Sequence, residues 1–127
     1  LSMFKQIGEI LIWSEDYKRL ADWYREIFHL KAVEELSHPQ DTGILFEFPG
    51  GKPWLWVGKH SEISGKNKDP LRIMINIRVE SVDAAFEYLK NKGVEFIAEP
   101  FKAPVSESYF ATFYDLDRNV LQIIGPK

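Results

Sequence analysis

The chain of 127 residues contains no cysteine, which excludes disulfide bonds, thiolate metal sites and a thiol nucleophile. This suits a reducing compartment, and we expect a cytoplasmic location. No apolar run approaches the roughly 18 residues of a membrane-spanning helix, and no segment is typical of a signal peptide. The net charge is −3, and no basic stripe of the kind that binds nucleic acid is present. We therefore expect neither a membrane nor a nucleic acid as a partner.

One pattern of elements occurs twice along the chain. A helix followed by a strand is predicted in Glu15–Glu35 and again in Glu80–Glu99, because apolar residues recur at i, i+3, i+4 and i+7 in each. Ser14 and Ser81 stand where each helix should be capped, and Gly93 can end the second with a positive φ. An apolar strand precedes each copy and two more follow it. The repeat therefore predicts two βαβββ modules.

This pattern defines the expected fold class and domain organisation. We predict an α+β fold in which two βαβββ modules form one pseudo-symmetric domain, with curved mixed sheets around a cleft. The domain covers residues 1–127, with module one at 4–60, a linker at 61–70 and module two at 71–125. The predicted strands are Ile7–Trp13, Leu30–Leu36, Ile44–Phe48, Trp54–His60, Leu71–Val79, Val94–Ala98, Tyr109–Tyr114 and Val120–Ile124.

Three segments resemble the vicinal-oxygen-chelate superfamily, which includes glyoxalase I, bleomycin-resistance proteins, fosfomycin-resistance enzymes and extradiol dioxygenases. Residues 113–123 (FYDLDRNVLQI) resemble the family hairpin F-x-D-P-D-G-N-x-x-E-L, with leucine, arginine and glutamine replacing its proline, glycine and glutamate. Residues 23–30 (WYREIFHL) resemble the helix end F-Y-x-x-x-L-G-L, and residues 77–84 (IRVESVDA) resemble the strand-to-helix junction of the second module. The resemblance covers essentially the whole chain and implies the same two-module fold.

Family enzymes usually hold a divalent metal through one ligand on the first and last strand of each module. The resemblance places these four positions at Glu9, Trp56, Met74 and Gln122. A catalytic site needs at least three nitrogen or oxygen ligands and an open position. The indole nitrogen is protonated and a thioether suits Cu(I), so only Glu9 and Gln122 qualify. We expect no cofactor, with a divalent metal disfavoured and these two residues as its ligands if one binds.

The expected cleft is aromatic with a few polar groups. Trp54 and Trp56 share one face of their predicted strand, and Glu9 supplies a carboxylate. Pockets for small organic molecules have this composition, and aromatic faces attract cations. The predicted ligand-binding residues are Glu9, Trp54, Trp56, Met74, Phe113 and Gln122. The alternative for the aromatic residues is a place in the core, where alternating strand aromatics more often lie.

Three functions are compatible with these residues. The favoured one is metal-free binding of a small aromatic or cationic molecule, as the resemblance to bleomycin-resistance proteins implies. The second is a glyoxalase-like lyase or isomerase that uses a degenerate metal site or Glu9 as a general base. The third is a domain whose dimer surface is its only role. Single-domain members of the superfamily usually pair, so we expect a homodimer.

Overall fold

The computed structural model describes all 127 residues. The chain divides into two compact units, Leu1–Gly65 and Lys66–Lys127, which we call the first and second modules. The boundary between them lies inside the predicted linker at 61–70. Each module has one α-helix and one four-stranded mixed sheet, so the predicted α+β fold of two βαβββ modules is confirmed. Neither helix has the length and apolar character needed to cross a bilayer.

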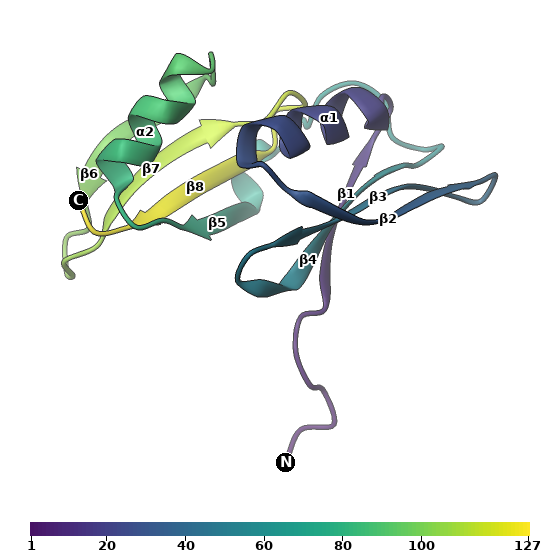
Figure 1. Cartoon of the computed structure of the whole chain (residues 1–127), viewed down its shortest axis with the longest axis horizontal. Coiled ribbons are helices and arrows are strands. Elements are labelled where there is room, and N and C mark those ends of the chain that lie inside the picture. The colour runs from purple at the N-terminus through teal and green to yellow at the C-terminus, as the bar shows by residue number, and fades with distance from the viewer. The chain divides into compact units, whose positions relative to one another are not determined.

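The first module builds its sheet from strands on both sides of its helix in the sequence (Figure 1). Its elements are β1 (Glu9–Ser14), α1 (Tyr17–Phe28), β2 (Lys31–His38), β3 (Asp41–Phe48) and β4 (Gly51–Lys59). The strand order is β1-β4-β3-β2, with β1 parallel to β4 and the other pairs antiparallel. The long connection through α1 is what allows β1 and β4 to pair in parallel.

The second module repeats this arrangement. Its elements are the short 3-10 helix η1 (Pro70–Arg72), β5 (Met74–Arg78), α2 (Val82–Asn91), β6 (Phe96–Lys102), β7 (Tyr109–Tyr114) and β8 (Val120–Gly125). The strand order is β5-β8-β7-β6, and β5 is again parallel to its neighbour. The two sheets therefore have the same topology, as the repeat in the sequence predicts.

The helix caps confirm the sequence prediction in the second module and correct it in the first. Ser81 caps α2, since its hydroxyl accepts a hydrogen bond from the Ala84 N–H at 3.2 Å. Gly93 follows this helix with φ +81°, as predicted. The N-cap of α1 is Asp16, not Ser14, and its carboxylate accepts from the Arg19 N–H at 3.4 Å. Ser14 instead ends β1, and its hydroxyl accepts from the Asp16 N–H.

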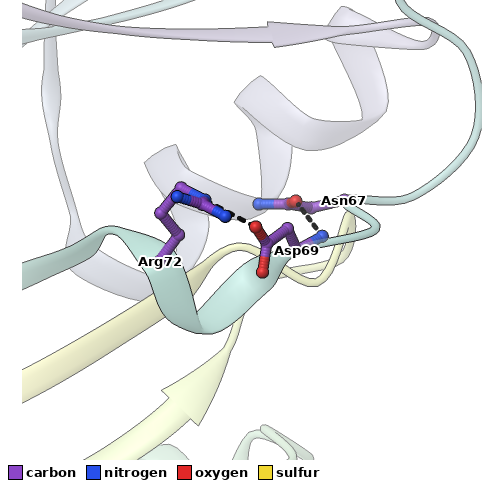
Figure 2. Close-up of polar contacts among 3 residues, drawn as sticks. All are labelled: Asn67, Asp69 and Arg72. Atoms are coloured by element: carbon purple, nitrogen blue, oxygen red, sulfur yellow. Dashed lines mark hydrogen bonds and ion pairs between the residues drawn. The ribbon is translucent and has the colours of Figure 1, made fainter.

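The beginning of the second module differs from the predicted strand at Leu71–Val79. Asp69 precedes a 3-10 turn that begins at Pro70, and β5 begins only at Met74. Figure 2 shows the local contacts that stabilise this turn: the Asn67 side chain accepts from the Asp69 N–H at 2.9 Å, and Asp69 pairs with Arg72 at 2.5 Å. A proline at the first helical position favours a turn over an extended strand. The strand is therefore shorter than its apolar sequence suggests.

Several other predicted strand boundaries are wrong, among them the start of β4, which lies at Gly51 and not at Trp54. The loop expected at 37–42 is a tight hairpin, because β2 continues to His38 and β3 begins at Asp41. Strand β6 begins at Phe96 and continues through Pro100 to Lys102, where a loop was expected. Strand β6 is an edge strand, and proline is tolerated at sheet edges because its missing N–H costs no ladder hydrogen bond there.

Each module has its own hydrophobic core between its helix and one face of its sheet. The first contains Leu20, Ala21, Tyr24 and Ile27 of α1 with Ile44, Phe46, Leu55 and Val57 of the sheet. The second contains Val82, Phe86 and Leu89 of α2 with Ala111, Phe113, Leu121 and Ile123. The alternation of strand residues then leaves every second side chain of β4 and β8 on the face that points away from the helix.

Two residues other than glycine have a positive φ angle: His29 at +52° and Arg118 at +63°. His29 ends α1, and Arg118 lies in the β7–β8 turn, where Asp115 accepts hydrogen bonds from the Asp117 and Asn119 N–H groups. Both occupy positions where the family pattern has glycine. Each module thus keeps a left-handed backbone conformation at this position, although it lacks glycine, the residue that adopts this conformation at the lowest steric cost.

Candidate ligand-binding face

The first candidate site is the sheet face of the first module that points away from α1, which we call the first open face. Leu55 and Val57 of β4 are buried on the helix side, so Trp54, Trp56 and Gly58 point the other way. Strand β1 contributes the register partners of these residues: Glu9 lies beside Trp54, Leu11 beside Trp56 and Trp13 beside Gly58. Strand β3 adds Gly43 and Leu45, the partners of Gly58 and Trp56.

Trp56 lies flat on this face over a pair of glycines. Gly43 and Gly58 are register partners, and neither has space for a side chain. A Cβ atom on Gly43 would lie 2.5 Å from Cζ2 of Trp56, and one on Gly58 would lie 2.7 Å from Cε2 and overlap Nε1. The indole therefore packs directly against both glycines, and its exposed fraction is only 5%. We call the two glycines the Trp56 seat.

The indole N–H of Trp56 is buried without a hydrogen-bond partner. A buried unpaired donor costs about 1–3 kcal/mol, and such groups are rare in folded proteins. The neighbouring ring is Trp13, whose centroid is 6.3 Å from that of Trp56 at an interplanar angle of 68°. Trp13 also packs edge-on against His60 at 5.4 Å. The face thus carries a row of aromatic rings beside one unsatisfied donor.

Charged groups lie at the other end of this face. The Lys52 ammonium lies 4.9 Å from the ring centroid of Trp54, which is half-buried. Glu9, the register partner of Trp54, is exposed and has no hydrogen-bond or ion-pair partner. Leu11, two residues after Glu9 on β1, is 51% exposed. The first open face therefore combines exposed apolar surface with one ammonium group and more than one carboxylate, since Glu34 of β2 pairs in register with Leu45 of this face.

The corresponding face of the second module, the second open face, carries a polar cluster whose members pair with one another, beside the aromatic ring of Phe110. Asn76, Gln122 and Thr112 are neighbours on β5, β8 and β7. The Asn76 amide donates to Gln122 Oε1 at 3.0 Å, and the Gln122 amide donates to Thr112 Oγ1 at 3.2 Å. Met74 shares this face by alternation and is 45% exposed. Gln122 thus has partners at both its oxygen and its nitrogen.

Phe113 does not lie on the second open face, so its prediction as a ligand-binding residue is wrong. It is fully buried on the helix side, where its ring centroid lies 5.3 Å from that of Phe96. The register shows why: Thr112 is the partner of Gln122, so Phe113 points to the opposite face. Asn76 and Thr112 were missed by the sequence interpretation, and alternation from Met74 would have located Asn76.

The residues at the family's metal-ligand positions do not fit a divalent metal. Glu9 and Trp56 belong to the first open face, and Met74 and Gln122 to the second. Trp56 can only donate, and the Gln122 amide oxygen already accepts from Asn76. The chain has no group of three or more His, Cys, Asp or Glu side chains that could hold a metal ion. The cleft that would join the two open faces stays a prediction.

Comparisons with known proteins agree with this fold. The family model described as Glyoxalase/Bleomycin resistance protein/Dioxygenase superfamily matches residues 6–123. The uncharacterized protein YetH of Bacillus subtilis (strain 168) is 24% identical over 119 residues, which cover 93% of this chain and 96% of that protein.

Two solved structures share the fold at low sequence identity. TnmS3, an antibiotic binding protein from Streptomyces sp. CB03234, aligns over 100% of both chains with a TM-score of 0.79 and 18% identity. The genomically encoded fosfomycin resistance protein FosX from Listeria monocytogenes aligns over 98% of this chain and 96% of its own, with a TM-score of 0.74 and 17% identity. At such identities the structural likeness establishes the fold alone.

Proposed function

Because the chain belongs to the glyoxalase/bleomycin resistance protein/dioxygenase superfamily, we propose that it binds a small organic molecule, aromatic or cationic, without a catalytic metal. The observation that carries this proposal is the aromatic row of the first open face, in which Trp56 lies in its glycine seat beside Trp13. Rigid aromatic surface with a few polar groups suits planar ligands. TnmS3 supports the proposal, since it is described as an antibiotic binding protein on this fold.

The contacts available on this face would together suffice for micromolar affinity. Stacking on half-buried Trp54 and covering Leu11 would remove apolar surface from water at about 25 cal/mol per Å². A cationic ligand would gain about 0.5–2 kcal/mol from the aromatic faces and would find an unpaired carboxylate in Glu9. Lys52 already occupies one face of Trp54. A cation that binds the same face of Trp54 would therefore have to displace the Lys52 ammonium.

The alternative function is a glyoxalase-like lyase or isomerase, which would use a degenerate metal site or Glu9 as a general base. FosX, which was also solved in complex with Mn(II), is an example of metal binding on this fold. Two observations favour the binding function instead. Glu9 is exposed to solvent, and both the oxygen and the nitrogen of the Gln122 side-chain amide already have hydrogen-bond partners. Elemental analysis that finds one equivalent of Mn, Fe, Ni or Zn per chain, lost in Glu9→Ala, would reverse this ranking.

A homodimer in the cytoplasm remains part of the proposal. Strands β1 and β5 are edge strands, hydrogen-bonded to a neighbour on one side only. Exposed apolar residues accompany both edges, Leu11 on β1 and Ile73, 75% exposed, next to β5. Edges of this kind invite pairing with a second copy. Sedimentation of the purified chain tests this, and a particle of 14.8 kDa at micromolar concentration would contradict it.

The binding function is tested by a ligand screen with tryptophan fluorescence and thermal shift. Planar ligands should quench the fluorescence and raise the melting temperature, and Trp54→Leu should weaken both effects. The matched control is Trp23→Phe, because Trp23 packs on α1 against Tyr24 and Phe28, away from the open face. If a broad library gave neither quenching nor a thermal shift, the aromatic row would be part of the hydrophobic core only.

A further inference from the structure

We propose that the molecule bound by the first open face carries a hydrogen-bond acceptor that pairs with Nε1 of Trp56. The inference rests on the proposed function and specifies the ligand class. The ligand is a planar ring system with a carbonyl oxygen or an unprotonated ring nitrogen as its acceptor. A positive charge without such an acceptor is not sufficient for recognition. The observation that carries it is the buried, unpartnered indole N–H.

The Trp56 seat fixes where this donor lies. A Cβ atom on Gly58 would overlap Nε1, so the nitrogen is directly above the Gly58 Cα on the open face. Both glycines confine the ring, and Leu45 and Leu11 flank it as register partners. The indole therefore cannot rotate its N–H toward solvent without leaving the seat. An acceptor has to come to the donor.

The chemistry of the donor selects the ligand. An indole nitrogen donates and never accepts, so it pairs with the negative end of a dipole and repels a cationic group. A phenylalanine in the same seat would be buried with no unpaired polar atom. The ring of His60, which packs against Trp13, uses its Nδ1 to accept from the Glu62 N–H and does not satisfy Trp56. The indole N–H of Trp56 can therefore form a hydrogen bond only with an acceptor that does not belong to the chain.

Access to this donor requires a neighbouring side chain to move, since Nε1 exposes less than 1 Å². Trp13 is the candidate, because it is only partly buried, its ring contacts the Trp56 ring and it is the register partner of Gly58. A planar ligand that replaces Trp13 against Trp56 would keep the aromatic contact. It would also place an acceptor beside Nε1.

Glu9 adds a second requirement on the ligand. It pairs in register with Trp54, two residues from Trp56 along β4, which corresponds to roughly 7 Å at 3.3–3.4 Å per residue. A ligand that spans this distance would place its acceptor at Trp56 and a donor or positive group near Glu9. The two ends of the first open face thus recognise opposite ends of one elongated, polar aromatic molecule.

The test uses three bicyclic probes of the same shape and ¹⁵N-labelled full-length protein. At neutral pH quinoline has a ring-nitrogen acceptor, naphthalene has none, and N-methylquinolinium is a planar cation whose acceptor is blocked. The chain has four tryptophans, and their indole N–H signals are observed separately by NMR. The Trp56 signal is assigned from its contacts with the Gly43 and Gly58 α-protons, so the test does not depend on a variant.

We expect quinoline to move the Trp56 indole proton downfield and to bind about three- to tenfold more tightly than naphthalene, the range of one net hydrogen bond. In Trp56→Phe the preference should disappear while both probes still bind. The control Trp23→Phe should keep the preference unchanged, because Trp23 lies on α1.

Three outcomes would overturn the inference. Equal affinity of quinoline and naphthalene with no shift of the Trp56 signal would show that no acceptor is recognised, and it would leave the proposed binding of aromatic molecules intact. Tighter binding of N-methylquinolinium than of quinoline would assign the face to cations. If no probe bound and none of the four signals moved, the proposed function would fail together with the inference.

Discussion

The two modules have the same order of elements, yet their open faces carry different chemistry. The first presents Trp13, Trp54 and Trp56, with an indole donor that has no partner. The second presents Asn76, Gln122 and Thr112, whose side chains satisfy one another. A surface whose polar groups are already paired gains little from a ligand, whereas an unpaired buried donor gains a full hydrogen bond. The specificity of the proposed binding function should therefore reside in the first module.

The helix-facing sides of the two sheets are alike, in contrast to the open faces. Both cores combine an aromatic residue of the helix with aliphatic and aromatic strand residues, Tyr24 with Phe46 in one and Phe86 with Phe113 in the other. Because strand side chains alternate, one face can keep the core while the other changes. The repeated fold therefore places no requirement on the chemistry of the open faces.

The largest expected effect separates the two faces of the second module. Phe113→Ala should lower the free energy of unfolding by about 3–5 kcal/mol, because it removes a fully buried ring from beneath α2. Met74→Ala on the open face should cost less than about 1 kcal/mol, since nearly half of the Met74 surface is already exposed to solvent. Urea unfolding measures both. Equal costs would contradict the assignment of the two residues to opposite faces.

The next effect tests the Trp56 seat. Gly58→Ala should destabilise the protein by about 1–3 kcal/mol, because the new methyl group overlaps the indole and lies 2.9 Å from the Thr42 carbonyl oxygen. Gly50→Ala is the matched control, since nothing lies within 4 Å of its Cβ position. Combining Gly58→Ala with Trp56→Leu in a double-mutant cycle should recover part of the cost. Strict additivity would show that the ring does not depend on the glycines.

A third pair of substitutions compares the polar groups of the two open faces. Gln122→Met should cost about 1–2 kcal/mol, because Asn76 and Thr112 both lose a hydrogen-bond partner. Trp56→Phe loses ring volume, but it also removes a buried donor that has no partner, and the second effect offsets part of the first. The free energy of unfolding should therefore fall less than in Gln122→Met. Chemical denaturation of the two variants checks the order. A larger loss in Trp56→Phe would mean that its indole nitrogen is satisfied after all.

The smallest effects concern the two residues with positive φ. His29→Gly should stabilise the first module by roughly 0.5–1 kcal/mol, since glycine adopts φ +52° without steric cost. Arg118→Gly should gain less, because the guanidinium lies 4.0 Å from the Tyr114 ring centroid and 3.7 Å from Glu95, and both contacts would be lost. Melting temperatures of both variants decide this, and a greater gain at Arg118 would contradict it.

The fold could be predicted from the sequence because its signals are local. The helix periodicities, the Ser81 cap and Gly93 each act within a few residues, and the structure confirms them. Ser14 was assigned wrongly as a cap because Asp16, two residues later, is an equally good capping residue and Ser14 was needed to complete β1. The prediction of a loop at 37–42 was wrong for a similar reason, since polar residues also occur in exposed strands.

The candidate site could be predicted only in part, because it depends on which face of each sheet the helix covers. Trp54 and Trp56 were assigned correctly to one face of their strand, because residues i and i+2 of a strand point to the same side whatever its register with its neighbours. Phe113 and Gln122 come from adjacent strands, and only the pairing of Thr112 with Gln122 shows that they point in opposite directions. The unpaired indole nitrogen has no signal in the sequence, because it results from the contacts of the folded ring.

The Trp56 seat also constrains which combinations of residues this face can carry. No tryptophan can occupy position 56 as it does here while a side chain is present at Gly43 or Gly58. A Cβ atom on Gly43 would also lie 2.7 Å from the Gly58 Cα atom and from the Val57 carbonyl oxygen, so loss of the indole alone would not make room for it. The three positions should therefore be epistatic, and a side chain at either glycine should require both a change at position 56 and a shift of the paired strands.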